Sequence, residues 1–560
     1  MFEKICIWAR QSPNYALVLI TLVALGPFLA KPFNIDDPLF IWAGHQIQAH
    51  PLNPYGFNVA WDTTAAPMWQ ITDNPPLTCY YIALTAGIFG WSEIALHVAF
   101  LIPAIAVVLG TCRLAQRLCQ NPMAAAMITL LGPFFLVSAT SVMCDVTLLA
   151  FWIWAAVFWV EGPESPKKLA AAGLLIALAE MTKYFGVCLI PLLAAYSLAR
   201  RQPIRRWGPA LLIPLGVLCA YQYVTQSVYG YSLLYRAMDF ASLSQNVIGF
   251  SKIQNSLIAL SFAGGGMATA VFFAPLFWQK RELPTLTAAA LLVAGILYFD
   301  ASLWNRYGSL HGWALGAVKI QMIFWAAGGL WLLALAVSDL CRHRDADSLL
   351  LFLWVAGTFF FTAFCNWTVN ARSILPMAPA VAILVARRLQ SKFAEQTTGR
   401  STGMAISLVA GGTLTLLVTR ADFSAACAVR QSALETCARF GGTSDCLWFQ
   451  GHWGFQFYMD PAVSAALDFE HSILKPGDLL AVPAGNTSVM TPESSRATPL
   501  DVLTFSGLEP LATWNVNAGA GFYAAVYGPV PFVFGAIPPE RVSIYAWKAS
   551  PETFLKPSRQ

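Results

Sequence analysis

The chain has 560 residues, 57% of them hydrophobic and only 11% charged, whereas a typical soluble domain is about 25% charged. This composition excludes a soluble enzyme and indicates a protein that crosses a membrane many times. The formal net charge of +5 comes from Lys and Arg residues between the apolar stretches. There they set topology, and they form no patch of the kind that binds nucleic acid.

The first apolar run, residues 14–31, follows Lys4 and Arg10 and is not followed by a small-residue cleavage site. We therefore predict a retained anchor with its amino-terminal side in the cytoplasm, because Lys and Arg accumulate on that side of a membrane. The acidic pair Asp36-Asp37, which follows the run, then lies outside. Chemistry that depends on these carboxylates would be extracytoplasmic.

The predicted first outer loop, residues 32–90, contains an amphipathic stretch and a rigid turn. We expect residues 38–48 to form a short helix on the membrane surface. Its apolar face, predicted to lie toward lipid, consists of Phe40, Ile41 and Trp42. Asp73 and Asn74 stand before two prolines, which fix a turn into the apolar segment 76–90, a re-entrant or surface helix.

Twelve further stretches approach the length that a bilayer requires, which makes thirteen predicted spans. Lys and Arg are concentrated in the loops that this arrangement places in the cytoplasm, as the positive-inside pattern requires. An odd number of spans sends the carboxyl-terminal tail outside. The predicted spans are 14–31, 91–112, 122–140, 143–160, 168–182, 184–199, 208–226, 256–278, 285–301, 317–339, 348–365, 373–388 and 402–419.

After residue 419 the sequence becomes too polar, and too often broken by proline and charge, to cross a membrane. We predict a transmembrane domain over residues 1–419 and an extracytoplasmic α/β domain over residues 420–560. The expected elements of this tail are strands at 446–450, 478–482 and 542–547 and a helix at 455–473.

Twelve cysteines occur without the CxxC spacing of a metal or redox site. Cys437 and Cys446 lie in the predicted outer tail on either side of a Gly-Gly turn. An oxidising compartment would allow a disulfide between them, and the sequence leaves open whether one forms.

Three carboxylates are predicted on the outer face: Asp36, Asp73 and Asp145, the last near the outer end of the fourth span. Together their oxygens suit a hard divalent cation, and a spare carboxylate can act as general base on an acceptor hydroxyl. Each also has a structural explanation: Asp36 as a helix cap, Asp73 as an Asx-turn residue, Asp145 as a charge that reaches water. Their placement on one face favours a functional site.

Four short segments carry a resemblance to a known family. They are Asp36-Asp37 with Pro38-Leu39-Phe40-Ile41-Trp42-Ala43, Asn74-Pro75-Pro76-Leu77 with Tyr80-Tyr81, Asp145 within Met143–Leu149, and Thr182-Lys183-Tyr184. Together they resemble the C-superfamily of membrane glycosyltransferases, in the branch of protein O-mannosyltransferases and lipid A aminoarabinose transferases. The resemblance extends weakly over residues 14–388. It implies a polytopic helical fold with an external tail and a sugar donor carried on a polyprenyl phosphate.

The resemblance also implies a role for each matching residue. Asp36 corresponds to the aspartate that deprotonates the acceptor, and Asp37 beside it would orient the surface helix or assist binding. Asp73 and Asp145 fall where the family places metal-site carboxylates, here for Mg, Mn or Zn. We expect one divalent cation between them, because both face the same compartment and neither has an obvious basic partner nearby. Asn74 replaces a lysine that some members use beside that site, and it is predicted to contact the donor phosphate.

Two cations are expected to bind the donor phosphate. Lys183 is predicted at the outer surface between two short spans, where its ammonium either meets a lipid phosphate or snorkels to the interface. Arg372, within Asn370-Ala371-Arg372-Ser373-Ile374-Leu375-Pro376, resembles the family's Arg-Tyr-Leu-Leu-Pro element, and a guanidinium binds two phosphate oxygens at once. Its alternative is an arginine held by lipid headgroups.

The tail contains one segment dense in aromatic residues, 451–459, which includes His452. These side chains can stack a sugar or a peptide. Burial in a core explains them equally well, and a single histidine in a loop is more often structural than catalytic.

We therefore expect an enzyme of a bacterial inner membrane that transfers a sugar from a polyprenyl-phosphate donor to a hydroxyl of a lipid, glycan or protein acceptor. A transporter or lipid-carrier flippase is the main alternative, but such proteins often have two related halves, and we find no such symmetry in this sequence. A third possibility, a scaffold that presents the tail, predicts that Asp36, Asp73 and Asp145 all tolerate Ala.

Overall fold

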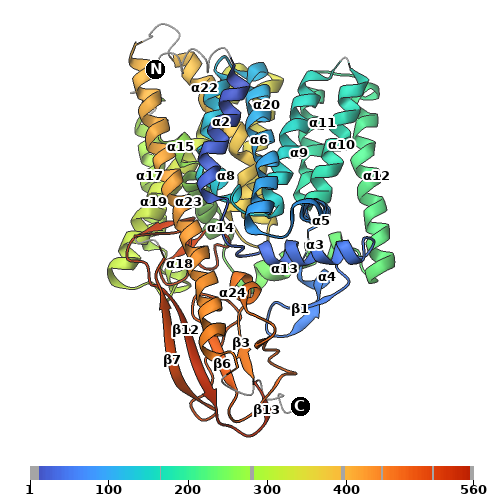
Figure 1. The fold of residues 1–560 in the computed structure, drawn as a ribbon. Coiled ribbons are helices and arrows are strands. Elements are labelled where there is room, and N and C mark those ends of the chain that lie inside the picture. The colour runs from blue at the N-terminus through green and yellow to red at the C-terminus, as the bar shows by residue number, and fades with distance from the viewer. Residues whose placement is uncertain are drawn as a thin grey trace.

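The computed structural model describes residues 12–72, 74–163, 165–277, 283–392, 398–442, 446–507 and 510–554. Asp73, one of the two residues predicted to bind a metal, lies outside the described residues. Figure 1 shows a region of long helices and, below it, a smaller region that holds most of the strands.

The helical region begins with α2 and ends with α22, and α23 continues from it into the strand region (Figure 1). The helices are α2 (Pro13–Leu25), α3 (Asp37–Ala49), α4 (Met68–Ile71), α5 (Leu77–Phe89), α6 (Glu93–Leu118), α7 (Pro122–Leu130), α8 (Pro133–Ser138), α9 (Cys144–Glu161), α10 (Pro166–Thr182), α11 (Leu189–Ala199), α12 (Ile204–Tyr229), α13 (Leu233–Ile248), α14 (Lys252–Gly266), α15 (Ala268–Val271), α16 (Ala274–Phe277), α17 (Leu283–Phe299), α18 (Ala301–Asn305), α19 (Gly312–His343), α20 (Ala346–Phe360), α21 (Ala371–Ile374), α22 (Ala378–Lys392), α23 (Thr398–Phe440) and α24 (Trp453–Tyr458).

Among the described residues, six helices are long and apolar enough to cross a bilayer, and a seventh span results if α14 and the helices after it, bent by 81°, count as one. The six are α6, α9, α12, α19, α20 with the turn that follows it, and α23. Shorter apolar helices, including α5, accompany them. The chain is therefore a multi-pass membrane protein, as predicted, while the number of thirteen spans stays a prediction.

The predicted span at 122–140 is interrupted in the structure. α8 starts afresh at Pro133, because a proline has no N–H to continue the helical hydrogen bonds of α7. The carbonyl of Leu131, at the break, accepts hydrogen bonds from the hydroxyls of Thr269 and Thr415. Other helices thus supply the bonds that water would supply outside a bilayer.

Helix α3 lies across the end of the helical region that faces the strands (Figure 1). It matches the helix predicted at 38–48, but its expected lipid-facing side is wrong. Phe40 and Ile41 are only 4% and 1% exposed, and the Trp42 ring contacts the rings of Trp61 and Phe457. The tail and the first loop cover the face that the sequence pattern assigned to lipid.

The strand region is built on a mixed five-stranded sheet in the order β4-β3-β6-β12-β7. β3 pairs in parallel with β4 and β6, and β12 pairs antiparallel with β6 and β7. The strands are β1 (Asn58–Ala60), β2 (Ala65–Pro67), β3 (Leu447–Phe449), β4 (Ser464–Ala466), β5 (Ile473–Leu474), β6 (Leu479–Pro483), β7 (Ala497–Phe505), β8 (Leu511–Ala512), β9 (Trp514–Asn515), β10 (Ala520–Gly521), β11 (Val533–Phe534), β12 (Glu540–Trp547) and β13 (Glu552–Thr553). The predicted strands at 446–450, 478–482 and 542–547 correspond to β3, β6 and β12.

One expectation about the tail differs from the structure. The helix predicted at 455–473 is limited to α24, because the chain turns at Asp460, whose carboxylate accepts the N–H of Ala462 at 2.9 Å, and then enters β4. Residue 419 lies inside α23, which runs unbroken into the strand region (Figure 1), and the domain boundary predicted there stays a prediction. Cys437 and Cys446 are both free thiols.

The strand region is bonded to the helices near α21. The backbone N–H of Ala371 donates to the carbonyl of Phe522 at 2.9 Å, and that of Ala525 donates to the carbonyl of Val369 at 2.8 Å. The hydroxyl of Tyr307 donates to the carbonyl of Ala525 at 2.7 Å. The segment that includes residues 522–525 therefore holds the residues around α21 in place.

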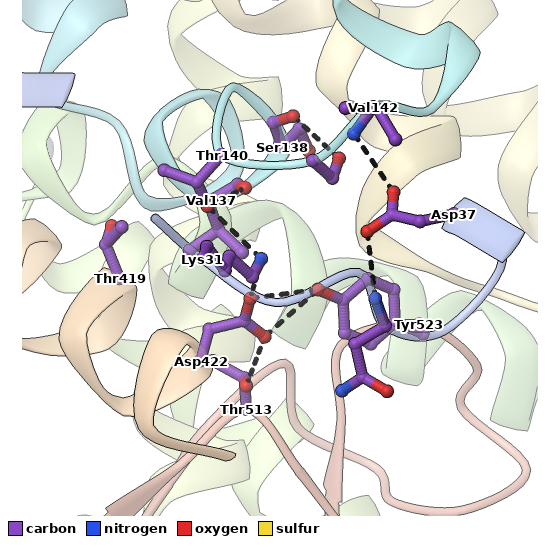
Figure 2. A network of polar contacts seen from close by, with 12 residues as sticks. Lys31, Asp37, Val137, Ser138, Thr140, Val142, Thr419, Asp422, Thr513 and Tyr523 are labelled. Carbon is purple, nitrogen blue, oxygen red and sulfur yellow. Dashed lines mark hydrogen bonds and ion pairs between the residues drawn. The ribbon is translucent and has the colours of Figure 1, made fainter. Parts of the chain in front are cut away.

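A buried ion pair adds to this attachment (Figure 2). Nζ of Lys31 lies 2.5 Å from Oδ2 of Asp422 on α23, and the same ammonium donates to the hydroxyl of Thr140 at 3.2 Å. The hydroxyls of Thr513 and Tyr523, both from the tail, donate to the Asp422 carboxylate at 2.7 and 3.0 Å. The first loop, α23 and the tail thus meet at one carboxylate.

Lys31→Met should lower the stability of the protein by about 3–5 kcal/mol, because it leaves the buried Asp422 charge without its cation. Asp422→Asn added to it should restore part of this loss, since the amide oxygen still accepts from Thr513 and Tyr523. The apparent Tm in detergent measures both effects. Lys475→Met, at an exposed tail lysine, is the control, and equal Tm values for the single and double variants would contradict a charge effect.

Candidate active site

Four charged side chains from distant parts of the chain meet near the junction of the two regions. Nη1 of Arg372 lies 2.7 Å from Oδ2 of Asp36, and Nζ of Lys183 lies 2.9 Å from Oδ1 of Asp145. Nε of Arg372 is 3.9 Å from Oδ2 of Asp145. We call Asp36, Arg372, Asp145 and Lys183 the charged cluster, in which negative and positive groups alternate.

The ends of helices position these side chains. Asp145 lies in the first turn of α9, where a carboxylate is favoured by the helix dipole. Lys183 directly follows α10. Arg372 belongs to α21. Asn370 caps this helix, because the side chain of Asn370 accepts the N–H of Ser373 at 2.8 Å. The positions of these helix ends therefore determine where the side chains of Asp145, Lys183 and Arg372 extend from the backbone.

The four side chains differ in exposure. The Asp145 side chain is 3% exposed, Arg372 16%, Lys183 20% and Asp36 25%. Asp36 precedes α3 but makes no side-chain cap bond, so the alternative reading of it as a helix cap fails. It is the carboxylate of the cluster that a ligand reaches most easily.

Two buried atoms of the cluster lack a hydrogen-bond partner: Oδ2 of Asp145 and Nε of Arg372. Their separation of 3.9 Å is too long for a hydrogen bond. Buried polar groups are normally satisfied, so a free acceptor beside a free donor suits a polar ligand.

The premise of the predicted metal site needs correction. Asp145 was expected to lack a basic partner, but Lys183 and Arg372 lie on either side of it. Within the described ranges no three His, Cys, Asp or Glu residues form a group that could hold a metal ion. The described residues alone therefore do not fit a divalent cation, and such a site would depend on Asp73, which lies outside them.

Asp37 has a different role from Asp36. Its side chain is buried, and its oxygens accept the N–H of Asn34 and the N–H of Val142, each at 3.0 Å (Figure 2). It ties the first loop to the segment that leads into α9. The geometry supports Asp37 as a positioning residue rather than a group that contacts substrate.

The backbone directly before Asp36 is strained. Ile35 has a φ of +52°, which is unusual for a β-branched residue and costs on the order of 1–3 kcal/mol. Burial of Ile35 and the two hydrogen bonds of Asp37 hold it there. Strain directly before Asp36 is consistent with a site that fixes this carboxylate in one orientation.

Burial raises the pKa of the Asp37 carboxyl from 3.8 to about 7. Between these two values the folded protein holds a proton that the unfolded chain has released, so the contribution of Asp37 to stability falls as the pH rises through this window. Asp37→Asn should flatten this part of the curve. It should also lower stability by about 1–3 kcal/mol, because one backbone N–H loses its acceptor.

The apparent Tm of both proteins, measured in steps from about pH 5 to about pH 8, tests this prediction. Asp501→Asn, at an exposed tail aspartate, should change neither the Tm nor its pH dependence. A variant curve parallel to that of the wild type would contradict the raised pKa.

Asn74, the third residue predicted to bind the donor phosphate, is not linked to the cluster by any contact among the described residues. Its backbone carbonyl accepts the hydroxyl of the buried Tyr55 at 2.7 Å. This bond fixes the position of the loop, and the role of the Asn74 side chain stays a prediction.

Several residues near the cluster were not predicted from the sequence. Sδ of Met143 lies 2.9 Å from Nη1 of Arg372, and Tyr523 and Asp422 join the tail to the first loop through Lys31. A lysine at the end of an apolar run is a signal that could have pointed to Lys31. No local pattern marks Tyr523.

Comparison with known proteins bears on the predicted family resemblance. Residues 73–224 match the family model described as dolichyl-phosphate-mannose-protein mannosyltransferase. Over this stretch, which contains Asp145 and Lys183, the predicted resemblance to the C-superfamily of membrane glycosyltransferases is confirmed. Asp36 and Arg372 lie outside the matched residues. No curated protein sequence matches the chain.

Three solved structures are similar to this one at low identity. The oligosaccharyltransferase of Archaeoglobus fulgidus, tethered to an acceptor peptide, has 11% identity and a TM-score of 0.49, with 82% of this chain and 64% of that chain covered. ArnT from Cupriavidus metallidurans, bound to undecaprenyl phosphate, has 13% identity and a TM-score of 0.44 over 81% and 85%. The arabinofuranosyltransferase AftD from Mycobacteria has 11% identity and a TM-score of 0.39 over 96% and 40%.

The chain thus spans less than two thirds of the oligosaccharyltransferase chain. Because all three TM-scores lie below 0.5, we base the function proposed below on the family match and on the charged cluster.

Proposed function

We propose that the protein is a membrane glycosyltransferase that transfers one sugar from a polyprenyl-phosphate donor to the hydroxyl of an acceptor. The observation that carries this proposal is the charged cluster, in which the accessible carboxylate of Asp36 pairs with Arg372 and the buried carboxylate of Asp145 lies between Arg372 and a second cation, Lys183. A base and a phosphate-binding pair are the groups that such a transfer needs. The family match over residues 73–224 supports the same chemistry.

In the proposed reaction Asp36 accepts the proton of the acceptor hydroxyl. The hydroxyl oxygen then forms a bond to the anomeric carbon of the donor sugar, and the bond from that carbon to the phosphate oxygen breaks. Direct displacement inverts the anomeric centre. The polyprenyl phosphate leaves with one more negative charge, which Arg372 and Lys183 stabilise.

Arg372 would link donor binding to activation of the acceptor hydroxyl. Its guanidinium pairs with Asp36 at 2.7 Å, so a phosphate that takes over the guanidinium would free Asp36 to accept a proton. Asp145, almost fully buried between Arg372 and Lys183, keeps both cations in place. Donor binding would then precede activation of the acceptor.

We further propose that the protein lies in a bacterial inner membrane with the cluster and the tail on the extracytoplasmic side. α9 supports this orientation, because Asp145 is near its first residue and Glu161 is its last. Its 18 residues span about 27 Å at 1.5 Å per residue. Glu161 pairs with Arg113 at 2.6 Å and with Lys168 at 3.0 Å, so the far end is the basic one.

A labelled-donor assay tests the proposed function. Purified protein is given a panel of polyprenyl-phosphate sugars, each with a labelled sugar, together with lipid, glycan and peptide acceptors. We expect one donor to lose its label to an acceptor, and Asp36→Asn to prevent this. If no donor loses its label to acceptor or water while the protein remains folded, the function is not sugar transfer.

A divalent cation that binds through Asp73 and Asp145 is a separate proposal. The free Oδ2 of Asp145 leaves room for one metal bond. We expect a chelator to lower turnover and an added divalent metal to restore it. Turnover that survives chelation would leave Asp145 only as the partner of the two cations.

A further inference from the structure

A cavity of about 70 Å³ lies between the first loop, α23 and the strand region. The first loop contributes Asn34, and α23 contributes small residues, among them Ala425. The strand region contributes two indole rings and several polar side chains. Those that matter here are Trp453, Trp514, Asn515 and Glu540.

The lining combines aromatic rings with amides and a carboxyl group. The rings of Trp453 and Trp514 meet edge to face, with their centroids 4.8 Å apart. Indole rings pack against apolar C–H groups, whereas amide and carboxyl groups hydrogen-bond hydroxyls. A ring with apolar faces and hydroxyls on its edge, as in a sugar, matches both requirements.

Two features show that the lining is not ordinary core. Oδ1 of Asn34 is buried and has no hydrogen-bond partner. Trp453 has a φ of +61°, a conformation that costs a bulky residue on the order of 1–3 kcal/mol. The first loop packs closely against Gly454, which has no side chain. A Cβ at this position would lie 2.6 Å from the carbonyl oxygen of Phe33 and 2.9 Å from Oδ1 of Asn34.

Glu540 adds a group that can both donate and accept. The N–H of Gly485 donates to its Oε1 at 3.3 Å, and its carboxyl group covers Gly485 so closely that no Cβ would fit. Burial raises the pKa of the Glu540 carboxyl to about 7. Near neutral pH part of the population is therefore protonated and can donate to a hydroxyl.

The cavity adjoins the Asp36 side of the charged cluster. Asn34 stands two residues before Asp36, and its backbone N–H donates to Asp37 at 3.0 Å. Tyr523 also lines the cavity, and it follows Phe522, whose carbonyl accepts the N–H of Ala371. An occupant of the cavity therefore contacts the segment that directly precedes the proposed base.

We propose that this cavity is a saccharide subsite for the acceptor, so that the hydroxyl activated by Asp36 belongs to a glycan. The proposal rests on the function proposed above. The acceptor is favoured over the donor sugar because Asn34 and Ile35, directly before Asp36, line the cavity, whereas neither Arg372 nor Lys183 lines it. A ring edge bound there would present the next hydroxyl of the glycan to Asp36.

Ala425→Phe tests this subsite, because it fills the cavity from α23 and removes no polar contact of the cluster. Ala438→Phe, on an exposed position of the same helix that does not line the cavity, is the matched control. Asn34→Ser removes the unpartnered oxygen and keeps the backbone N–H that Asp37 binds. All are made in the full-length protein and checked for an unchanged apparent Tm.

Binding is measured by equilibrium dialysis with labelled neutral oligosaccharides and, in parallel, with Ser- and Thr-containing peptides. We expect an oligosaccharide to bind to wild type and to Asp36→Asn alike. Ala425→Phe should weaken this binding at least tenfold, Asn34→Ser severalfold, and Ala438→Phe not at all. Donor binding should stay unchanged in Ala425→Phe.

Three outcomes would overturn the subsite: no oligosaccharide binds, the peptides bind in its place, or Ala425→Phe weakens donor binding and leaves saccharide binding intact. The subsite and the proposed function fail separately. If Ala425→Phe removes saccharide binding but no donor transfers its sugar, the subsite is supported and the proposed transferase function is wrong. If transfer occurs and the acceptor KM is unchanged in Ala425→Phe, the transferase function is supported and the subsite is wrong.

Discussion

Asp36→Asn should lower the rate of sugar transfer by about two to four orders of magnitude, because loss of a general base typically has an effect of this size. The amide cannot accept the proton of the acceptor hydroxyl at neutral pH. Its oxygen still accepts a hydrogen bond from Arg372, so expression and donor binding should remain close to those of the wild type. Turnover of labelled donor under saturating conditions measures the effect.

Two variants control for this result. Asp501→Asn makes the same chemical change at an exposed tail position and should leave turnover unchanged. Asp36→Glu keeps a carboxylate but lengthens the side chain, so it should retain more activity than Asp36→Asn. If Asp36→Asn turns over within a few-fold of wild type, Asp36 is not the base.

Loss of Arg372 and Lys183 should raise the donor concentration needed for half-maximal rate more than it lowers the saturated rate. Both cations are expected to hold the donor phosphate before the reaction begins, and ground-state binding is lost first. A hydrogen bond to a charged group contributes about 1.5–3 kcal/mol, so each substitution should weaken donor binding by about ten- to a hundredfold. Direct binding of a polyprenyl-phosphate sugar measures this effect.

Replacing both Arg372 and Lys183 by Ala would leave Asp145 buried with no cation, which would destabilise the fold. Lys183→Gln and Arg372→Lys avoid this problem, because each keeps a donor beside Asp145. Lys252→Ala, at an exposed lysine, is the control for loss of a positive charge. If donor affinity is the same as wild type in both single variants, the phosphate lies elsewhere, and Arg236 or Arg306 becomes the next candidate.

The candidate site shows where sequence reasoning reaches its limit. Asp36, Asp145, Lys183 and Arg372 were all found from motifs, because each sits at a helix end or loop with a recognisable local pattern. The metal assignment depended on Asp145 being without a basic partner. In the structure Lys183 and Arg372 are both basic partners of Asp145. No pattern within one segment of the sequence could have shown that they lie beside it.

The roles of the acidic pair illustrate the same point. In sequence Asp36 and Asp37 are equivalent neighbours: Asp36 was predicted to be the base, and Asp37 was predicted to orient the surface helix or assist binding. In the structure Asp37 turns inward to two backbone N–H groups, whereas Asp36 turns to Arg372. Which of two adjacent side chains faces a ligand depends on the surroundings of the loop, here on the bonds to Asn34 and Val142.

The sequence by itself determined that the chain crosses a membrane repeatedly and where most helices and three tail strands lie, because hydrophobic length and periodicity are local properties. Tertiary structure alone decided that the tail covers α3, that Lys31 joins it to the first loop, and that four charges form one cluster. These features depend on distances between helix ends and on burial. Such quantities arise only when segments far apart in the chain pack together.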